Sequence, residues 1–256
     1  MSNDSVLGHA SKQSPGEQAF MPALCSAFSN SALSLSHKLQ GFSRHVRRQD
    51  VSRFLAKYEL FKLGLPANGS IVECGVFTGS GLFNWLHFSS ILEPYNHTRK
   101  IIGFDTFSGF PSIHEQDLKA GVSEHLHPGA LSTTSDMKQE IENLAQLHDR
   151  NRPLGHIPKV QLVAGNACET IPDYVNRNPH LLISLIYLDF DIYEPTKVAL
   201  ENLYPRVVRG GVIAFDELNC PEFPGETTAL MAHLDMRQVK LQRFPHDPYI
   251  SYFIKE

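Results

Sequence analysis

The 256-residue sequence has little clustered positive charge and no regular cysteine pattern. Its 23 basic and 27 acidic residues give a net charge of −4, and basic residues gather only at Arg44–Arg48. Because nucleic-acid binding needs a clustered basic face, we expect no nucleic-acid partner. The four cysteines form no C-x-x-C pair, so we expect reduced thiols and a cytoplasmic protein.

Long apolar runs are also missing. No stretch has the length of a bilayer span, and the first residues lack a basic segment followed by an apolar core, so we expect neither a membrane anchor nor export. Hydrophobic residues make up 42% of the chain, enough for one sizeable core, and we predict one main domain over residues 51–256. Residues 1–50 hold ten serines and too few apolar residues for a core of their own. We expect an N-terminal arm there, with a helix over residues 19–39, that is partly flexible or packs on another subunit of a homo-oligomer.

The most informative stretch is the glycine-rich run at residues 71–81, Ile-Val-Glu-Cys-Gly-Val-Phe-Thr-Gly-Ser-Gly. A short apolar strand ends in an acid and turns through three glycines, which lets backbone N–H groups approach a ligand closely. The glycine order differs from the dinucleotide pattern G-x-G-x-x-G, which argues against a dehydrogenase. It is similar to the E/D-x-G-x-x-x-G-x-G loop with which class I methyltransferases hold S-adenosylmethionine. We therefore predict that the cofactor is bound by Glu73, Gly75, Gly79 and Gly81; the alternative is an ordinary strand-to-helix turn that needs flexible glycines.

Further apolar runs alternate with helical patterns along the chain. The predicted strands after the first are 100–105, 160–164, 182–189 and 212–216, and the predicted helices are 51–64, 82–92, 168–176 and 195–208. Alternating segments at 239–255 indicate a terminal antiparallel hairpin. Together these patterns predict an α/β fold, a Rossmann-like, doubly wound, mainly parallel seven-stranded sheet that ends in the hairpin. Residues 107–157 have little strand signal and are expected to form a lid insertion with a helix near 135–147.

Ligands of an open parallel sheet bind outside the carboxyl ends of its strands. Asp105 ends the second predicted strand, where a carboxylate can accept both hydroxyls of an adenosine ribose. Asn166 and Ala167 follow the third strand, and the Asn166 amide is placed to hydrogen-bond the adenine edge. We add these three residues to the predicted cofactor site, with a plain turn role as the alternative for Asn166.

Four more acids follow the fourth and fifth strands, and we call them the acid cluster: Asp189, Asp191, Asp216 and Glu217. Residues i and i+2 of an extended chain point to one side, and the two strands should be neighbours, so the four carboxylates should lie close together. Four uncompensated carboxylates repel one another, and a hard divalent cation with oxygen ligands, Mg²⁺ above all, would relieve this repulsion. The alternative is that these acids cap the helices that follow.

Four segments of the chain resemble the macrocin and mycinamicin type of sugar O-methyltransferases and related polysaccharide-biosynthesis methyltransferases. They are Ile-Val-Glu-Cys-Gly-Val-Phe-Thr-Gly at 71–79, Gly-Phe-Asp-Thr-Phe-Ser-Gly-Phe-Pro at 103–111, Leu-Asp-Phe-Asp-Ile-Tyr-Glu-Pro-Thr at 188–196 and Tyr-Pro-Arg-Val-Val-Arg-Gly-Gly at 204–211. The resemblance covers residues 51–256. It implies methyl transfer from S-adenosylmethionine, with a divalent metal, to a hydroxyl of a nucleotide sugar, a glycan or a glycosylated metabolite.

The resemblance also implies roles for the acid cluster. Asp189, Asp216 and Glu217 are the expected metal ligands, and Asp191 is the expected general base. Glu217 stands where such enzymes commonly carry a second Asp, and Phe190 stands where they commonly carry a small Gly. These departures bear on the metal geometry and on the shape of the acceptor.

Other readings of the same residues stay open. His125, His127 or His246 could supply the base instead. The enzyme could methylate a different small molecule without a metal, or the chain could be a scaffold that keeps the cofactor fold without turnover.

Overall fold

The structure is a computed structural model that describes residues 14–118 and 123–256. It divides into two compact units, the first ending at Leu55 and the second spanning Ala56–Glu256. The first unit contains α1 (Pro15–Asn30), α2 (Leu35–Gln40), the 3₁₀ turn η2 (Phe42–Arg44) and the start of α3 (Arg48–Gly64). The single helix predicted over residues 19–39 is thus two helices, because Ser34 caps α2 by accepting a bond from the His37 N–H.

The second unit is built on one seven-stranded sheet with the strand order β3-β2-β1-β4-β5-β7-β6. The strands are β1 (Ser70–Cys74), β2 (Ile101–Asp105), β3 (Val160–Ala164), β4 (Ile183–Leu188), β5 (Val207–Phe215), β6 (Gln242–Arg243) and β7 (Ser251–Ile254). The first five pair in parallel, and β7 pairs antiparallel with both β5 and β6. The predicted fold class is confirmed, including the terminal hairpin.

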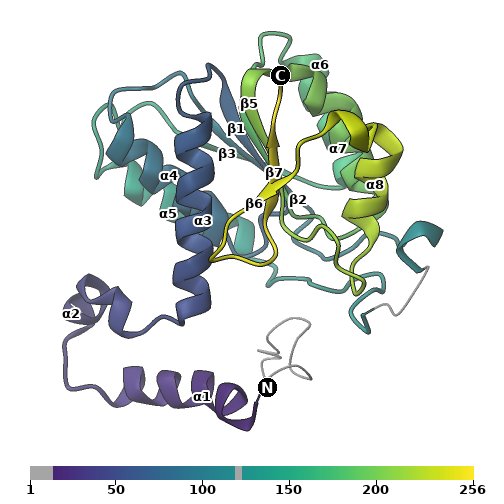
Figure 1. Ribbon diagram of the computed structural model, residues 1–256. Coiled ribbons are helices and arrows are strands. Elements are labelled where there is room, and N and C mark those ends of the chain that lie inside the picture. The colour runs from purple at the N-terminus through teal and green to yellow at the C-terminus, as the bar shows by residue number, and fades with distance from the viewer. Residues whose placement is uncertain (1–13, 119–122) are drawn as a thin grey trace. The chain divides into compact units, whose positions relative to one another are not determined.

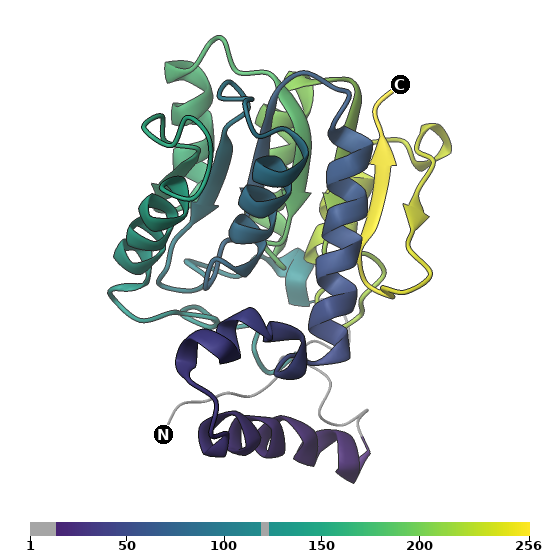
Figure 2. The ribbon, with the colours of Figure 1, turned by 90° about the vertical axis from the view of Figure 1, so that its left-hand side faces the viewer.

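Helices cover both faces of this sheet (Figures 1 and 2). The part of α3 from Ala56, α4 (Ser80–Leu92) and α5 (Met137–Asp149) lie on one face, and α6 (Ala167–Arg177), α7 (Tyr193–Leu203) and α8 (Gly225–His233) lie on the other. Short 3₁₀ turns are η3 (Glu115–Leu118), η4 (Tyr204–Arg206) and η5 (Met236–Gln238). In the described parts of the chain, no helix has the length and apolar character needed to cross a membrane.

The core is densest around the central strand β4, whose six residues are all buried. Strands of a parallel sheet are covered on both faces, which explains its nearly continuous apolar sequence Ile-Ser-Leu-Ile-Tyr-Leu. On the α6–α8 face, Ile186 and Leu188 join a large apolar cluster with Ala199 and Leu200 of α7. On the other face, the ring of Tyr187 lies 5.7 Å from that of Trp85 in α4.

Two local predictions were wrong. β5 begins at Val207, so Gly210 and Gly211 lie inside a strand and do not cap a helix. The Gly210 N–H donates to the Lys255 carbonyl next to β7, which extends the pairing of these two strands. α8 was not predicted at all, because Gly225–His233 lacks a clear amphipathic pattern.

The predicted lid insertion contains η3 and α5, and α5 lies close to the helix expected near residues 135–147. A small apolar cluster joins Phe110, Leu126 and Ala130 of this insertion to Ile192, which follows β4, and to Cys220 and Phe223, which follow β5. The insertion therefore packs at the carboxyl edge, where the parallel strands end. Its opening and closing stay a prediction.

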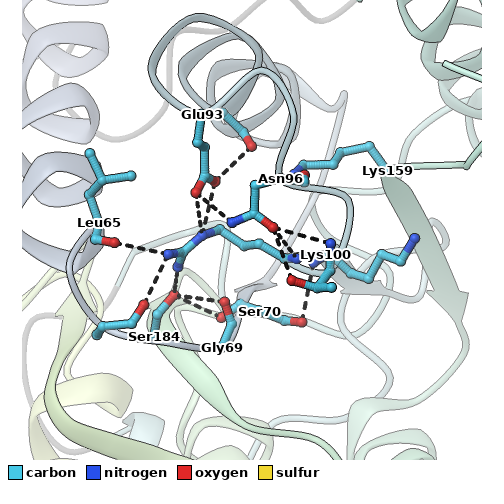
Figure 3. A network of polar contacts seen from close by, with 12 residues as sticks. Leu65, Gly69, Ser70, Glu93, Asn96, Lys100, Lys159 and Ser184 are labelled. Atoms are coloured by element: carbon cyan, nitrogen blue, oxygen red, sulfur yellow. Dashed lines mark hydrogen bonds and ion pairs between the residues drawn. The ribbon is translucent and has the colours of Figure 1, made fainter. Parts of the chain in front are cut away.

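At the opposite edge, Arg99 joins the starts of three strands. Figure 3 labels its partners Leu65, Glu93 and Ser184. Its guanidinium lies 2.9 Å from the Glu93 carboxylate, donates to the Ser184 hydroxyl of β4, and donates to the carbonyls of Leu65 (3.1 Å) and Ala67 (2.9 Å) ahead of β1. Arg99 is only 6% exposed. A planar guanidinium with five donors suits such a junction of buried acceptors.

We predict that Arg99→Met lowers the free energy of unfolding by about 3–5 kcal/mol, because it leaves the Glu93 carboxylate and two carbonyls without their buried partner. Urea unfolding followed by circular dichroism measures the change. Arg237→Met is the control: Arg237 pairs with Asp235 but is almost fully exposed, so the midpoint should not move. Equal effects of the two substitutions would show that the Arg99 junction is unimportant.

Candidate active site

The glycine loop joins β1 to α4 at the carboxyl edge of the sheet. Gly75 (φ +93°) and Gly79 (φ +88°) have left-handed backbones, and Gly79 caps α4. A Cβ at Gly75 would overlap the carbonyl oxygen of Asp189, and the Asp189 N–H donates to the Cys74 carbonyl at 2.8 Å. Glycine is therefore required at position 75 by the close approach of two backbones. The cofactor contacts of Gly75, Gly79 and Gly81 stay predictions.

Glu73 points into the protein, toward α3 and α4. It is 1% exposed, and its Oε1 lies 3.2 Å from the Lys57 ammonium. A Cβ at Gly81 would overlap this carboxylate, so that glycine makes room for the buried pair. Burial raises the pKa of Glu73 to about 6, although Lys57 and Trp85 act to lower it. The structure thus gives Glu73 an internal partner, and its predicted contact with the cofactor stays untested.

The Asp105 carboxylate hydrogen-bonds to two loops, the glycine loop after β1 and the loop that follows β2. Its Oδ2 accepts the N–H groups of Val76 (2.7 Å) and Phe77 (2.8 Å), and its Oδ1 accepts that of Phe107 (2.6 Å). Phe77 and Phe107 have positive φ angles of 49° and 56°, which non-glycine residues rarely adopt. The carboxylate therefore holds the glycine loop in shape. Its predicted bond to a ribose remains a prediction and would have to use the lone pairs that these three donors leave.

Asn166 is the N-cap of α6, and its side chain accepts the Cys168 N–H at 3.1 Å. Asn166 thus has a local structural role, as the alternative prediction held. Its side-chain NH₂ group is a further hydrogen-bond donor. Ala167 is 3% exposed and belongs to the core. The predicted cofactor contacts of Asn166 and Ala167 are not tested by these observations.

The residues of the acid cluster leave two neighbouring strands, β4 and β5. Leu188 pairs with Phe215, and the Asp216 N–H donates to the Leu188 carbonyl, so the residues after both strands leave the sheet side by side. Asp216 is buried, and Asp189, Asp191 and Glu217 are half-buried. Burial, and then the carboxylates of Asp189 and Glu217, raise the pKa of Asp191 well above its ordinary value.

Asp191 has a strained backbone. Its φ is +62°, and the Ile192 N–H donates to the Phe190 carbonyl at 2.7 Å, which closes a three-residue turn around it. Such conformations cost of order 1–3 kcal/mol and are concentrated at functional sites. Asp191 and Asp189 therefore do not lie on one extended strand, and their common position results from this turn.

The phenol of Tyr187 links the acid cluster to the buried pair of Glu73 and Lys57. Its hydroxyl donates to Asp216 Oδ1, and the Lys57 ammonium lies 4.0 Å from its ring centroid. A line of side chains thus runs from Glu73 through Lys57 and Tyr187 to Asp216. The sequence did not indicate it, because Tyr187 looks like any apolar residue of a buried strand.

A fifth acid, Glu226, was missed. It lies in the first turn of α8, is 0% exposed, and accepts backbone N–H groups from the loops after β4 and β5. Burial, and then the carboxylates of Asp189 and Asp216, raise the pKa of Glu226 well above its ordinary value. An acid in a first helical turn is a weak signal, and only a prediction of α8 itself could have drawn attention to it.

Two of the three candidate histidines have ring contacts of their own in the described chain. The His127 ring contacts the neighbouring Pro128 carbonyl, and the His246 ring stacks on Phe244 with centroids 5.7 Å apart. Across residues 14–118 and 123–256, no group of three or more histidine, cysteine, aspartate or glutamate side chains is arranged as a ready metal site. The donor set remains all-oxygen, which suits a hard cation, but its side chains would have to close around one.

Comparison with known proteins fits this geometry. The sequence profile of the macrocin O-methyltransferase (TylF) family matches residues 60–241. The chain belongs to the TylF family. Its match region begins in α3 and ends just before β6, so it includes both the glycine loop and the acid cluster.

Among relatives, this TylF-family chain is 30% identical over 161 residues to the 8-demethyl-8-(2,3-dimethoxy-α-L-rhamnosyl)-tetracenomycin-C 4′-O-methyltransferase of Streptomyces olivaceus, covering 60% of this chain and 54% of that protein. It is 27% identical over 165 residues to the demethyldecarbamoylnovobiocin O-methyltransferase of Streptomyces niveus, covering 62% and 56%. The chain thus matches about half the length of these curated relatives. A crystal structure of the calicheamicin methyltransferase CalS11 superposes with a TM-score of 0.91 at 31% identity, over 94% of this chain and 93% of that one.

We predict that Tyr187→Phe lowers methyl transfer by this TylF-family protein while leaving cofactor affinity unchanged. The substitution keeps the ring over Lys57 but removes the donor to the buried Asp216, which costs about 1–3 kcal/mol of unfolding free energy. Turnover assays and cofactor titration calorimetry measure the two effects. Tyr174→Phe is the matched control, since the Tyr174 hydroxyl binds Gln161 at the start of β3. A loss of activity of equal size in both variants would contradict a special role for Tyr187.

Proposed function

We propose that this protein is an S-adenosylmethionine-dependent O-methyltransferase that methylates a sugar hydroxyl, with a divalent cation in the acid cluster. The acceptor is a nucleotide sugar, a glycan or a glycosylated metabolite. Membership of the TylF family supports the reaction. The printed descriptions of its relatives support the acceptor class: one acts on a rhamnosyl group, and a second CalS11 structure is described as a TDP-rhamnose 3′-O-methyltransferase.

The contact between Gly75 and Asp189 carries the proposal. It joins the loop that would hold the methyl donor to the first residue of the acid cluster, which would receive the acceptor. Both halves leave the same edge of the sheet from adjacent strands, β1 and β4. Methyl transfer requires donor and acceptor to meet in line within van der Waals distance, and this edge brings the two halves together.

The chemistry needs a base near the acceptor. The acceptor oxygen attacks the methyl carbon, the carbon–sulfur bond breaks, S-adenosylhomocysteine leaves, and the hydroxyl proton passes to a carboxylate. We assign that proton to Asp191. A carboxylate whose pKa is raised above its ordinary value, as burial raises that of Asp191, is a stronger base than an ordinary one, provided that it is ionised when the acceptor arrives.

The metal is the finer part of the proposal. Asp189, Asp216 and Glu217 would hold the cation, since all their donors are oxygens and their mutual repulsion would fall. When bound, a divalent cation lowers the pKa of a coordinated hydroxyl. Positive charge in the acid cluster would also favour the ionised form of Asp191, which would then accept the proton.

The direct test is turnover of S-adenosylmethionine with sugar-nucleotide and glycoside acceptors. We expect S-adenosylhomocysteine to form with at least one of them, and Asp191→Asn to lower kcat by about 10²- to 10⁴-fold with cofactor affinity unchanged, because only the proton acceptor is lost. Asp235→Asn, a change in an exposed ion pair on η5, is the control. Cofactor binding without turnover on any acceptor would favour the scaffold alternative.

Metal dependence has its own test. We expect EDTA to abolish turnover and Mg²⁺ to restore it, and Asp216→Asn to raise the Mg²⁺ concentration needed for half-maximal activity. Cofactor binding by the chelated protein, measured by calorimetry, shows that the protein itself is intact. Full turnover under chelation, with Asp216→Asn still active, would instead identify a metal-independent methyltransferase.

A further inference from the structure

Glu226 connects the two loops that carry the acid cluster. Its Oε1 accepts the N–H groups of Phe190 at 3.2 Å and Asp191 at 3.4 Å, and its Oε2 accepts the N–H of Glu217 at 3.2 Å. One loop follows β4 and the other follows β5. A single side chain from a third element therefore joins the two segments beyond the backbone bond from the Asp216 N–H to the Leu188 carbonyl.

The backbone that carries the Glu226 side chain is itself held in place. Gly225 lies so close to the start of α7 that a Cβ there would crowd the Tyr193 nitrogen and the Asp117 carboxylate. Asp117 in turn accepts the Tyr193 N–H at 2.7 Å and the His114 N–H at 2.9 Å. The first turn of α8 thus packs closely against the start of α7. The Glu226 side chain extends from this turn and has no exposed surface.

The backbone that Glu226 holds is a strained one. Asp191 has a φ of +62°, and a residue with a side chain keeps such a conformation only where its surroundings enforce it. The bond from the Asp191 N–H to Glu226 is one such constraint, and the bond from the Phe190 N–H fixes the residue before it. Loss of these bonds would release the turn and swing the Asp191 carboxylate.

We propose that Glu226 is a positioning residue for methyl transfer: through three backbone bonds it holds Asp191, the proposed base, in register with Glu217, a proposed metal ligand. This inference rests on the function proposed above. Glu226 does not touch either substrate, because both of its oxygens face backbone N–H groups inside the protein.

The role requires both the two oxygens and the length of glutamate. In Glu226→Gln one oxygen becomes an NH₂ group, which faces an N–H donor and cannot accept from it. In Glu226→Asp both carboxyl oxygens stay, but the side chain is one methylene shorter and cannot span both loops. The two variants fail for different reasons and should have the same consequence.

The experiment compares kcat, acceptor KM, cofactor Kd, melting temperature and amide hydrogen exchange in wild type, Glu226→Gln and Glu226→Asp. We expect kcat to fall about 10- to 100-fold in both variants, because displacement of a base by about 1 Å has effects of this size. Cofactor Kd should stay within twofold of wild type, and exchange should accelerate in peptides over residues 188–193 and 215–219.

A double-substitution cycle separates positioning from general support of the fold. In an Asp191→Asn background, Glu226→Gln should lower kcat much less than it does alone, because the group that it positions is gone. Asp149→Asn is the matched control: this buried carboxylate pairs with Arg152 at the amino edge of the sheet, so its loss should lower the melting temperature and leave kcat unchanged.

Three results would overturn the inference: unchanged kcat in Glu226→Gln, unchanged exchange in both loops, or a fall in kcat matched by equal losses of cofactor binding and melting temperature. If Glu226→Gln does not fold, Glu226→Asp decides the same questions. If the wild type turns over no acceptor, the proposed function fails, and the exchange measurements alone still decide whether Glu226 holds the two loops.

Discussion

The close approach of Gly75 to Asp189 is the constraint on which the rest of the candidate site depends. Parallel pairing of β1, β4 and β5 brings the carboxyl ends of three strands to one edge, and the absent side chain at position 75 lets the first loop lie against the second. Any side chain there would push the glycine loop away from the acid cluster. The arrangement of the glycine loop and the acid cluster therefore depends on a contact between backbones as well as on the side chains of the acids.

Carboxylates at this edge fall into two kinds. Asp105, Asp117 and Glu226 accept backbone N–H groups from loops that are distant in sequence, and so they fix the shape of the edge. The acids of the acid cluster instead lie near one another, and burial, and then the carboxylates of Asp189 and Glu217, raise the pKa of Asp191. The first kind offsets the cost of burial with hydrogen bonds to the backbone.

The sequence predicted the sheet and the acid cluster because both follow from local signals. Apolar runs such as 160–164 mark buried strands, and acids at strand ends come together once the strands are adjacent. It failed where long-range contacts decide. Nothing local indicated that Glu73 pairs with Lys57, which lies on another element, and the cofactor contact of Glu73 stays a prediction. Gly210 and Gly211 looked like a helix end, but pairing with β7 draws them into β5. Glu226 gave no signal, since nothing local distinguishes an inward acid in a first helical turn from an exposed one.

The buried line from Glu73 to Asp216 joins the acid cluster to the buried pair of Glu73 and Lys57 on the face of the sheet that α3 and α4 cover. Lys57 neutralises Glu73 and also lies over the ring whose hydroxyl binds Asp216. A cation over the face of a tyrosine ring makes the hydroxyl of that ring a better donor. The positive charge of Lys57 therefore acts on Asp216 through Tyr187, although Lys57 itself is buried. Asp216 adds negative charge that raises the pKa of Glu73 from the other end. This line of side chains therefore connects the acid cluster with β1, the strand that leads into the glycine loop, through the core as well as at Gly75.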